Sequence, residues 1–142
     1  MKPTRIAAAL LASGVFSVWG NAYAADKVDF GKHEYEMKCA VCHGLEGRGN
    51  GAMAAVLKTR VSNLTYLSKN NNGVFPVKRV YEIIDGTEVL LAHGTREMPI
   101  WGTVYREEIG ESQTHVYDEF APAYVRAQIL ALIDYISRLQ AK

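Results

Sequence analysis

The most regular hydrophobic pattern in the chain lies near its C-terminus. Apolar residues recur there at helical spacing, at Val125, Ile129, Leu132, Ile133, Ile136 and Leu139. Proline suits the first turn of a helix, because the nitrogen at that position has no intrahelical partner to lose. The pattern therefore predicts a C-terminal helix with one apolar face that begins near Pro122.

A second helix is predicted between Asp26 and Cys39. Gly31, Tyr35 and Cys39 are spaced four residues apart and would share one helical face. Glycine inside a helix costs about 1 kcal/mol relative to alanine. A close helix crossing would explain the glycine, and a helix that begins only after Gly31 is the alternative.

The remaining patterns are shorter. Residues 77–86 read as a helix, with Pro76 just before them and Gly86 as a C-terminal stop. No convincing alternating strand is present, and residues 88–94 are the best candidate. Residues 104–122 carry many charges without a clear period, which predicts an exposed loop with at most a helical turn. Its acidic cluster is a solvated surface or a docking patch, and comprises Glu107, Glu108 and Glu111.

The N-terminus has the features of an export signal. Lys2 and Arg5 precede an uncharged, mostly apolar stretch, and the small-residue pattern of residues 22–24 follows. We predict a signal peptide over residues 1–24 and one domain over residues 25–142, with a retained N-terminal anchor as the alternative. Removal of the two basic residues lowers the formal net charge from +1 to −1. That balance does not favour nucleic acid or an anionic membrane as a partner, and we expect a periplasmic product with no membrane span.

The two cysteines of the chain, Cys39 and Cys42, are followed directly by His43. A disulfide between them would close a very short loop and remove little unfolded-state entropy. A redox-active pair would normally accompany a βαβ pattern, and a structural zinc site needs four ligands. The pattern instead matches Cys-x-x-Cys-His, the covalent haem attachment sequence. On a helical turn the three side chains share one face, so two thiols can add to the vinyl groups of one porphyrin while the imidazole reaches its iron.

A glycine-rich run follows the motif, with Gly44, Gly47, Gly49 and Gly51. Glycines allow sharp turns and a close approach to a ligand, so we predict a loop that wraps the haem, rather than an ordinary flexible surface loop. A ligating histidine usually donates its other ring N–H to an oxygen acceptor. We expect that acceptor to be a backbone carbonyl near Ala52 or Met53.

The second axial ligand of the iron decides its chemistry. The candidates are Met37, Met53, Met98, His33, His93 and His115. Met98 is the strongest, because Pro99 pushes it toward extended backbone and because Gly94 and Gly102 bracket the segment. The alternative is a methionine that fills core space, with His93 or His115 as a competing ligand.

With these residues in place, the sequence resembles the class I single-haem c-type cytochromes. "CAVCH" is similar to the haem attachment sequence of that family, and "MPIWG" to its distal methionine loop. The resemblance implies an all-α, cytochrome c-like fold of short helices wrapped around one covalently attached haem c. It implies that the N- and C-terminal helices cross where Gly31 meets Leu132 and Tyr135.

The resemblance also implies further haem contacts. The segment 63–67, with Leu64 and Leu67, resembles the stretch that packs beside the haem, and Trp101 resembles residues that line it or bind a propionate. The chain departs from the family pattern at Ala52, where many relatives have proline, and in the length of residues 104–122.

A histidine and a methionine would fill both axial positions of the iron, at His43 and Met98. We therefore expect an electron carrier rather than an enzyme, with transient contacts to a redox donor and a redox acceptor. One alternative is a permanent electron-entry subunit of a larger oxidoreductase. The other is a ligand-binding or catalytic haem protein whose Met98 leaves easily.

Overall fold

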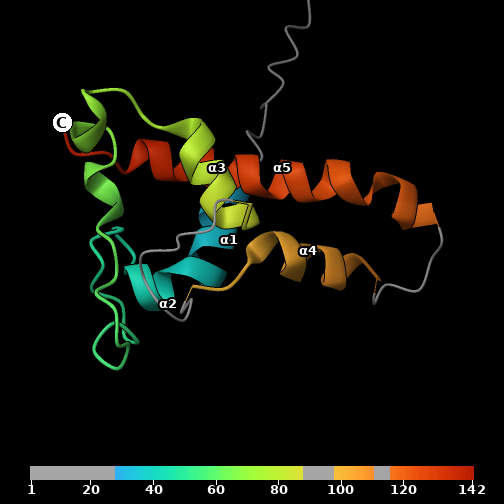
Figure 1. Cartoon of the computed structure of the whole chain (residues 1–142), viewed down its shortest axis with the longest axis horizontal. Coiled ribbons are helices and arrows are strands. Elements are labelled where there is room, and N and C mark those ends of the chain that lie inside the picture. The colour runs from blue at the N-terminus through green and yellow to red at the C-terminus, as the bar shows by residue number, and fades with distance from the viewer. Residues whose placement is uncertain (1–27, 88–97, 111–115) are drawn as a thin grey trace, which may run out of the picture.

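The computed structural model describes residues 28–87, 98–110 and 116–142 (Figure 1). The predicted signal peptide 1–24, the strand candidate 88–94, and the histidines His93 and His115 lie outside these residues. Within them every regular element is helical and no strand occurs, which confirms the all-α class. The elements are α1 (Phe30–Glu34), η1 (Tyr35–Cys39), α2 (Ala40–His43), η2 (Leu64–Tyr66), η3 (Lys69–Asn71), α3 (Val77–Asp85), α4 (Trp101–Gly110) and α5 (Val116–Arg138).

The N-terminal helical segment runs without a break from Phe30 to His43. Asp29 caps it, since its Oδ1 accepts from the backbone N–H of Lys32 at 3.0 Å. The helix therefore starts before Gly31 and includes it. Its middle, η1, is a π-helical turn in which the Ala40 N–H reaches the Tyr35 carbonyl. Such turns insert one extra residue into a helix and often mark functional sites.

The α3 helix forms where the sequence predicts it, over Val77–Asp85. Gly86 ends it in the left-handed region with φ of 91°, and its N–H bonds the Glu82 carbonyl. Only glycine adopts that backbone at little cost, so the stop is a property of residue 86 itself.

The segment 104–122 is not the exposed loop that the sequence predicts. Most of it is helical, because residues 104–110 belong to α4 and residues 116–122 to α5. The missed pattern is the spacing of Trp101, Tyr105 and Ile109, four residues apart, which places three apolar side chains on one face of α4. Tyr105 is fully buried, so this helix packs into the core.

The C-terminal helix also begins earlier than predicted. It starts at Val116 and contains Pro122 in its interior rather than in its first turn. An internal proline removes one backbone hydrogen bond, but packing between α4 and α5 continues along this helix and supports it. Figure 1 shows α5 as the long helix that lies along α4 and passes α1 and α3.

The core is formed where α1 crosses α5. The backbones approach so closely that a Cβ on Gly31 would collide with the Ala131 carbonyl and lie 3.2 Å from the Tyr135 Cβ. The rings of Tyr35 and Tyr135 lie 5.1 Å apart between centroids. This confirms the predicted crossing and the role of Gly31 in it. No helix among the described residues is both long and apolar enough to cross a membrane.

Candidate functional site

The attachment motif sits at the end of the N-terminal helical segment. Cys39 is the last residue of η1, while Cys42 and His43 close α2. All three are half-buried, and the two cysteines are not joined to each other. Burial raises the pKa of the Cys39 thiol to about 12, and the Glu34 carboxylate acts in the same direction. Reactive redox cysteines have a lowered pKa, so this site does not resemble a thiol–disulfide exchange centre.

His43 is held in one orientation by a backbone carbonyl. Its Nδ1 lies 3.1 Å from the Ser62 oxygen. A carbonyl can only accept, so Nδ1 carries the proton and the lone pair resides on Nε2. Burial also lowers the pKa of His43, which favours the neutral ring. A neutral, oriented imidazole with a lone pair on Nε2 is the form that ligates a metal.

The prediction that the acceptor lies near Ala52 or Met53 is wrong. Met53 instead donates its N–H to the Val41 carbonyl at 2.9 Å. That bond ties residue 53 to the back of the attachment turn. The chain comes back to the His43 ring at Ser62, whose carbonyl is the acceptor.

The glycine-rich loop satisfies the carbonyls at the end of the attachment helix. Each carbonyl of the turn accepts one bond from a loop N–H: Ala40 from Gly44 (2.8 Å), Val41 from Met53 (2.9 Å), Cys42 from Gly51 (3.0 Å) and His43 from Gly49 (2.8 Å). These are the carbonyls that a helix C-terminus otherwise leaves without partners. The loop is therefore an ordered cap on the motif rather than a flexible surface loop.

Two glycines show why other residues would not serve in this loop. Gly49 has φ of +77°, and a Cβ there would lie 2.6 Å from the Val61 oxygen. Gly51 would place a Cβ against the Val41 carbonyl and 2.6 Å from the Ala40 oxygen. Gly51 thus touches the motif, and Gly49 the returning segment at Val61, backbone to backbone, which only a residue without a side chain permits.

The segment 63–67 is anchored beside the glycine loop. Leu64 donates its N–H to the Gly47 carbonyl at 2.7 Å, and its own carbonyl accepts from Gln140 at 2.8 Å. Asn63 caps the short turn through the Thr65 N–H at 2.9 Å. These bonds hold Leu64 and Leu67 half-buried against the core, as expected for side chains that would line a haem.

Met98 differs from the other candidate methionines of the described residues. It is half-buried and packs against the core, whereas Met37 is 68% exposed and Met53 is 44% exposed. His33 is exposed on α1. Trp101 follows Met98 closely, begins α4 and also packs against the core.

The structure gathers most of the predicted site residues around one core. Cys39, Leu64, Leu67, Met98 and Trp101 are partly buried side chains on its edge. Four other partly buried side chains lie in the same position. The sequence did not single out Phe75, Tyr81 or Ile109, and it placed Leu139 only on the apolar face of the C-terminal helix. The donor set fits haem c, with two thiols, one oriented imidazole, one thioether and an apolar surround.

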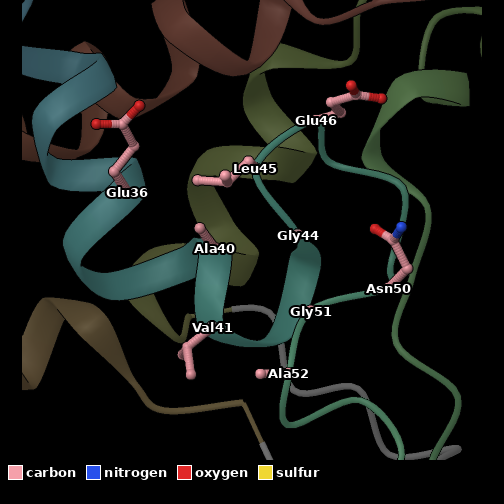
Figure 2. Close-up of a pocket in the computed structure, with 9 residues that line it drawn as sticks. All are labelled: Glu36, Ala40, Val41, Gly44, Leu45, Glu46, Asn50, Gly51 and Ala52. Atoms are coloured by element: carbon pink, nitrogen blue, oxygen red, sulfur yellow. The ribbon is translucent and has the colours of Figure 1, made fainter.

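A shallow pocket lies beside the attachment turn (Figure 2). Ala40 and Val41, which separate the two cysteines, line one side of it, and Gly51 and Ala52 lie next to Val41. Its remaining lining comes from Glu36, Gly44, Leu45, Glu46 and Asn50.

In a comparison with protein families, a family model described as Cytochrome c matches residues 28–140. No match was found among curated proteins or among solved structures. The matched range contains the attachment motif, the glycine loop, Met98 and both crossing helices.

Proposed function

The chain belongs to the cytochrome c family, and from that premise we propose that it is a periplasmic carrier of single electrons. The family binds a covalently attached haem c and has a haem-based electron-transfer role. Cys39 and Cys42 fit the two thioether positions of its attachment sequence. Our proposal concerns the ligands of the iron, the compartment and the partners.

We assign His43 and Met98 as the axial ligands. The observation that carries this assignment is the burial of Met98 against the core, while Met37 and Met53 are exposed. Together His43 and Met98 would hold the iron and would leave it no open site for oxygen or substrate. This coordination favours a carrier over an enzyme.

When bound, haem c supplies an iron that alternates between the ferric and ferrous states. The residues of the chain prepare the site for that change. The Ser62 carbonyl fixes the His43 ring, so little rearrangement is needed. The thioether of Met98 would favour the reduced state. Leu64, Leu67 and Trp101, which are partly buried, would keep water from the group and so would disfavour the more highly charged ferric state.

The compartment follows from the N-terminal sequence pattern. We propose that residues 1–24 are removed on export and that residues 25–142 act in the periplasm, without a membrane span. Mass spectrometry of the exported protein should give the mass of one chain beginning near Ala25 plus one haem.

The partners we propose are a redox donor and a redox acceptor that bind transiently. The contact surface would surround Cys39, Gly51 and Met98. Near the attachment turn Val41 is 48% exposed, Leu45 68% and Met53 44%. Val41 and Leu45 also line the pocket of Figure 2. Small, partly apolar surfaces suit carriers that must dissociate after each transfer.

A second candidate function is that of a permanent electron-entry subunit in a larger oxidoreductase. The outward side of α5 favours it, because Phe120 is 60% exposed while Tyr124 and Leu130 are each 46% exposed. Exposed apolar side chains are typical of permanent interfaces, which are more hydrophobic than transient ones. Co-purification with one partner at fixed stoichiometry would support this candidate, and a monomer that exchanges partners would support the carrier.

Stopped-flow kinetics on the native haem protein test the proposed function. Electron exchange with small redox dyes should be fast, and carbon monoxide should bind the ferrous protein poorly at neutral pH. Rapid carbon monoxide binding together with peroxide turnover would contradict the carrier and support a haem protein whose Met98 leaves easily.

A further inference from the structure

The position of Met98 depends on the position of α4. Only Pro99 and Ile100 separate Met98 from Trp101, the first residue of this helix. Pro99 also restricts the backbone of the residue before it. Whatever fixes the start of α4 therefore fixes where the Met98 side chain can lie.

Lys38 joins α4 to the segment that carries the first attachment cysteine. It directly precedes Cys39, and its Nζ lies 2.7 Å and 2.9 Å from the two carboxylate oxygens of Glu108 on α4. The same Nζ lies 3.5 Å from Glu34 Oε2 on α1. It also lies 4.4 Å from the ring centroid of Tyr105 and 6.0 Å from that of Trp101.

These contacts are partly shielded from water. The side chains of Lys38 and Glu34 are 21% and 13% exposed, and Tyr105 is fully buried with its hydroxyl 3.3 Å from Glu34. Ion pairs and cation–π contacts are stronger when they are partly desolvated. A neutral residue at position 38 would leave the carboxylates of Glu34 and Glu108 near each other without a cation.

Other contacts of α4 are made with α3. Its first turn packs against α3, where a Cβ on Gly102 would lie 2.6 Å from the Asp85 carbonyl oxygen. Arg106 lies 3.8 Å from the Asp85 carboxylate. These contacts secure α4 to α3, whereas Lys38 secures it to η1 and hence to the covalent attachment.

We propose that Lys38 is a positioning residue for the distal ligand: by pinning α4 to the Cys39 segment it holds Met98 at the iron. This inference rests on the proposed function, because it takes Met98 as the ligand. Lys38 itself touches the reacting group neither as a ligand nor as an attachment point.

The test compares haem-loaded variants of two lysines on the same helical segment. Lys38→Met removes the cation with little change of volume. Lys32→Met is the matched control, because Lys32 is 53% exposed and its ion pair, with Glu36 at 3.8 Å, lies within the segment. Two readouts are followed: the weak far-red absorption of the ferric protein that reports sulfur bound to iron, and the rate of carbon monoxide binding to the ferrous protein.

Lys38→Met should weaken the far-red band and speed carbon monoxide binding about fivefold, the scale of a partly exposed charged hydrogen bond. Lys32→Met should leave both at wild-type values. Lys38→Arg should keep both readouts close to their wild-type values, because it keeps the charge. Should Lys38→Met fail to fold, Glu108→Gln gives the decisive result, since that carboxylate is 45% exposed and its removal threatens the core least.

Equal readouts for the Lys38, Glu108 and Lys32 variants would overturn the inference, even if thermal stability fell. Failure of the proposed function would give a different result from failure of this inference. In that case the wild-type protein itself would lack the far-red band, and Met98→Ala would change neither readout.

Discussion

The attachment segment and the helix crossing are held together in different ways. In the attachment segment, residues 40–53, carbonyls and amides of the backbone contact each other directly through five hydrogen bonds. At the crossing of α1 and α5, the backbones meet at Gly31, and apolar side chains pack around that point, with Tyr35, Ile129 and Leu132 fully buried. The chemistry of the site thus rests on backbone geometry, and its stability rests on side-chain packing.

Two residues couple the two regions. Tyr35 lies in the crossing, yet its hydroxyl donates to the Gly44 carbonyl at 2.8 Å. Gly47 makes a second link, because a Cβ there would lie 3.2 Å from Leu139 Cδ1. A substitution in one region should therefore affect the other region only through these few contacts. The effects on the two regions can then be measured separately.

The largest effect is expected at the crossing. Gly31→Val would drive a side chain into the Ala131 backbone, and the two helices would have to separate. We expect a loss of about 3 kcal/mol or more in the free energy of unfolding, with little change in the haem spectrum of the protein that remains folded. Thermal or denaturant unfolding measures this, with Gly110→Val as the control because no atom lies within 4 Å of a Cβ at Gly110. Equal midpoints for the two variants would show that the crossing is not close.

The reverse pattern is expected in the attachment segment. Gly51→Ala would force a Cβ against the carbonyls of Val41 and Ala40, so the loop must shift away from the motif. We expect a smaller loss of stability, about 1–3 kcal/mol, but a lower yield of haem-loaded protein and an altered haem spectrum. Gly110→Ala is again the control. A normal spectrum with normal yield would break the comparison, because it would show that the motif does not depend on this backbone contact.

The smallest effect concerns the edge of the crossing and depends on pH. Arg138 bonds Asp29 at 2.7 Å, and this bond, together with the Lys32 N–H, lowers the pKa of Asp29 to about 2. A lowered carboxyl pKa gives stability that is present above the unfolded pKa of about 4 and is lost as pH falls toward 2.

Asp29→Asn keeps an N-cap acceptor but removes the charge. Its melting temperature should be slightly below that of the wild type at pH 7, and the difference should shrink below about pH 4. High salt should reduce the difference at pH 7 as well, because the pair is exposed. A difference that stays constant from pH 7 to pH 3 would show that the ion pair does not contribute.

The sequence predicts best the features that depend on neighbours along the chain. The spacing of Cys39, Cys42 and His43 predicts the site because residues three and four positions apart share one face of a helix. Gly86 marks the end of α3 for an equally local reason, since it must adopt a positive φ. Gly31 could be placed at a crossing because a glycine in a helix needs a compensating contact.

Features that depend on distant partners could not be predicted in the same way. The acceptor for His43 is Ser62, nineteen residues away, and which carbonyl returns to the ring depends on the path of the loop. Glu108 belongs to a cluster that reads as solvated surface, yet it meets Lys38, seventy residues away. The sequence does not predict helix α4, because charged residues between Trp101 and Ile109 make the apolar spacing difficult to recognise.

The ligand assignment at Met98 is the central claim, and one measurement tests it most directly. The far-red absorption of the ferric protein is recorded for the wild type and for Met98→Ala. The account predicts a weak sulfur-to-iron band in the wild type and complete loss of that band in the variant, with a lower reduction potential. A band that persists unchanged in Met98→Ala would contradict the account, because the ligand would then be Met53 or another residue.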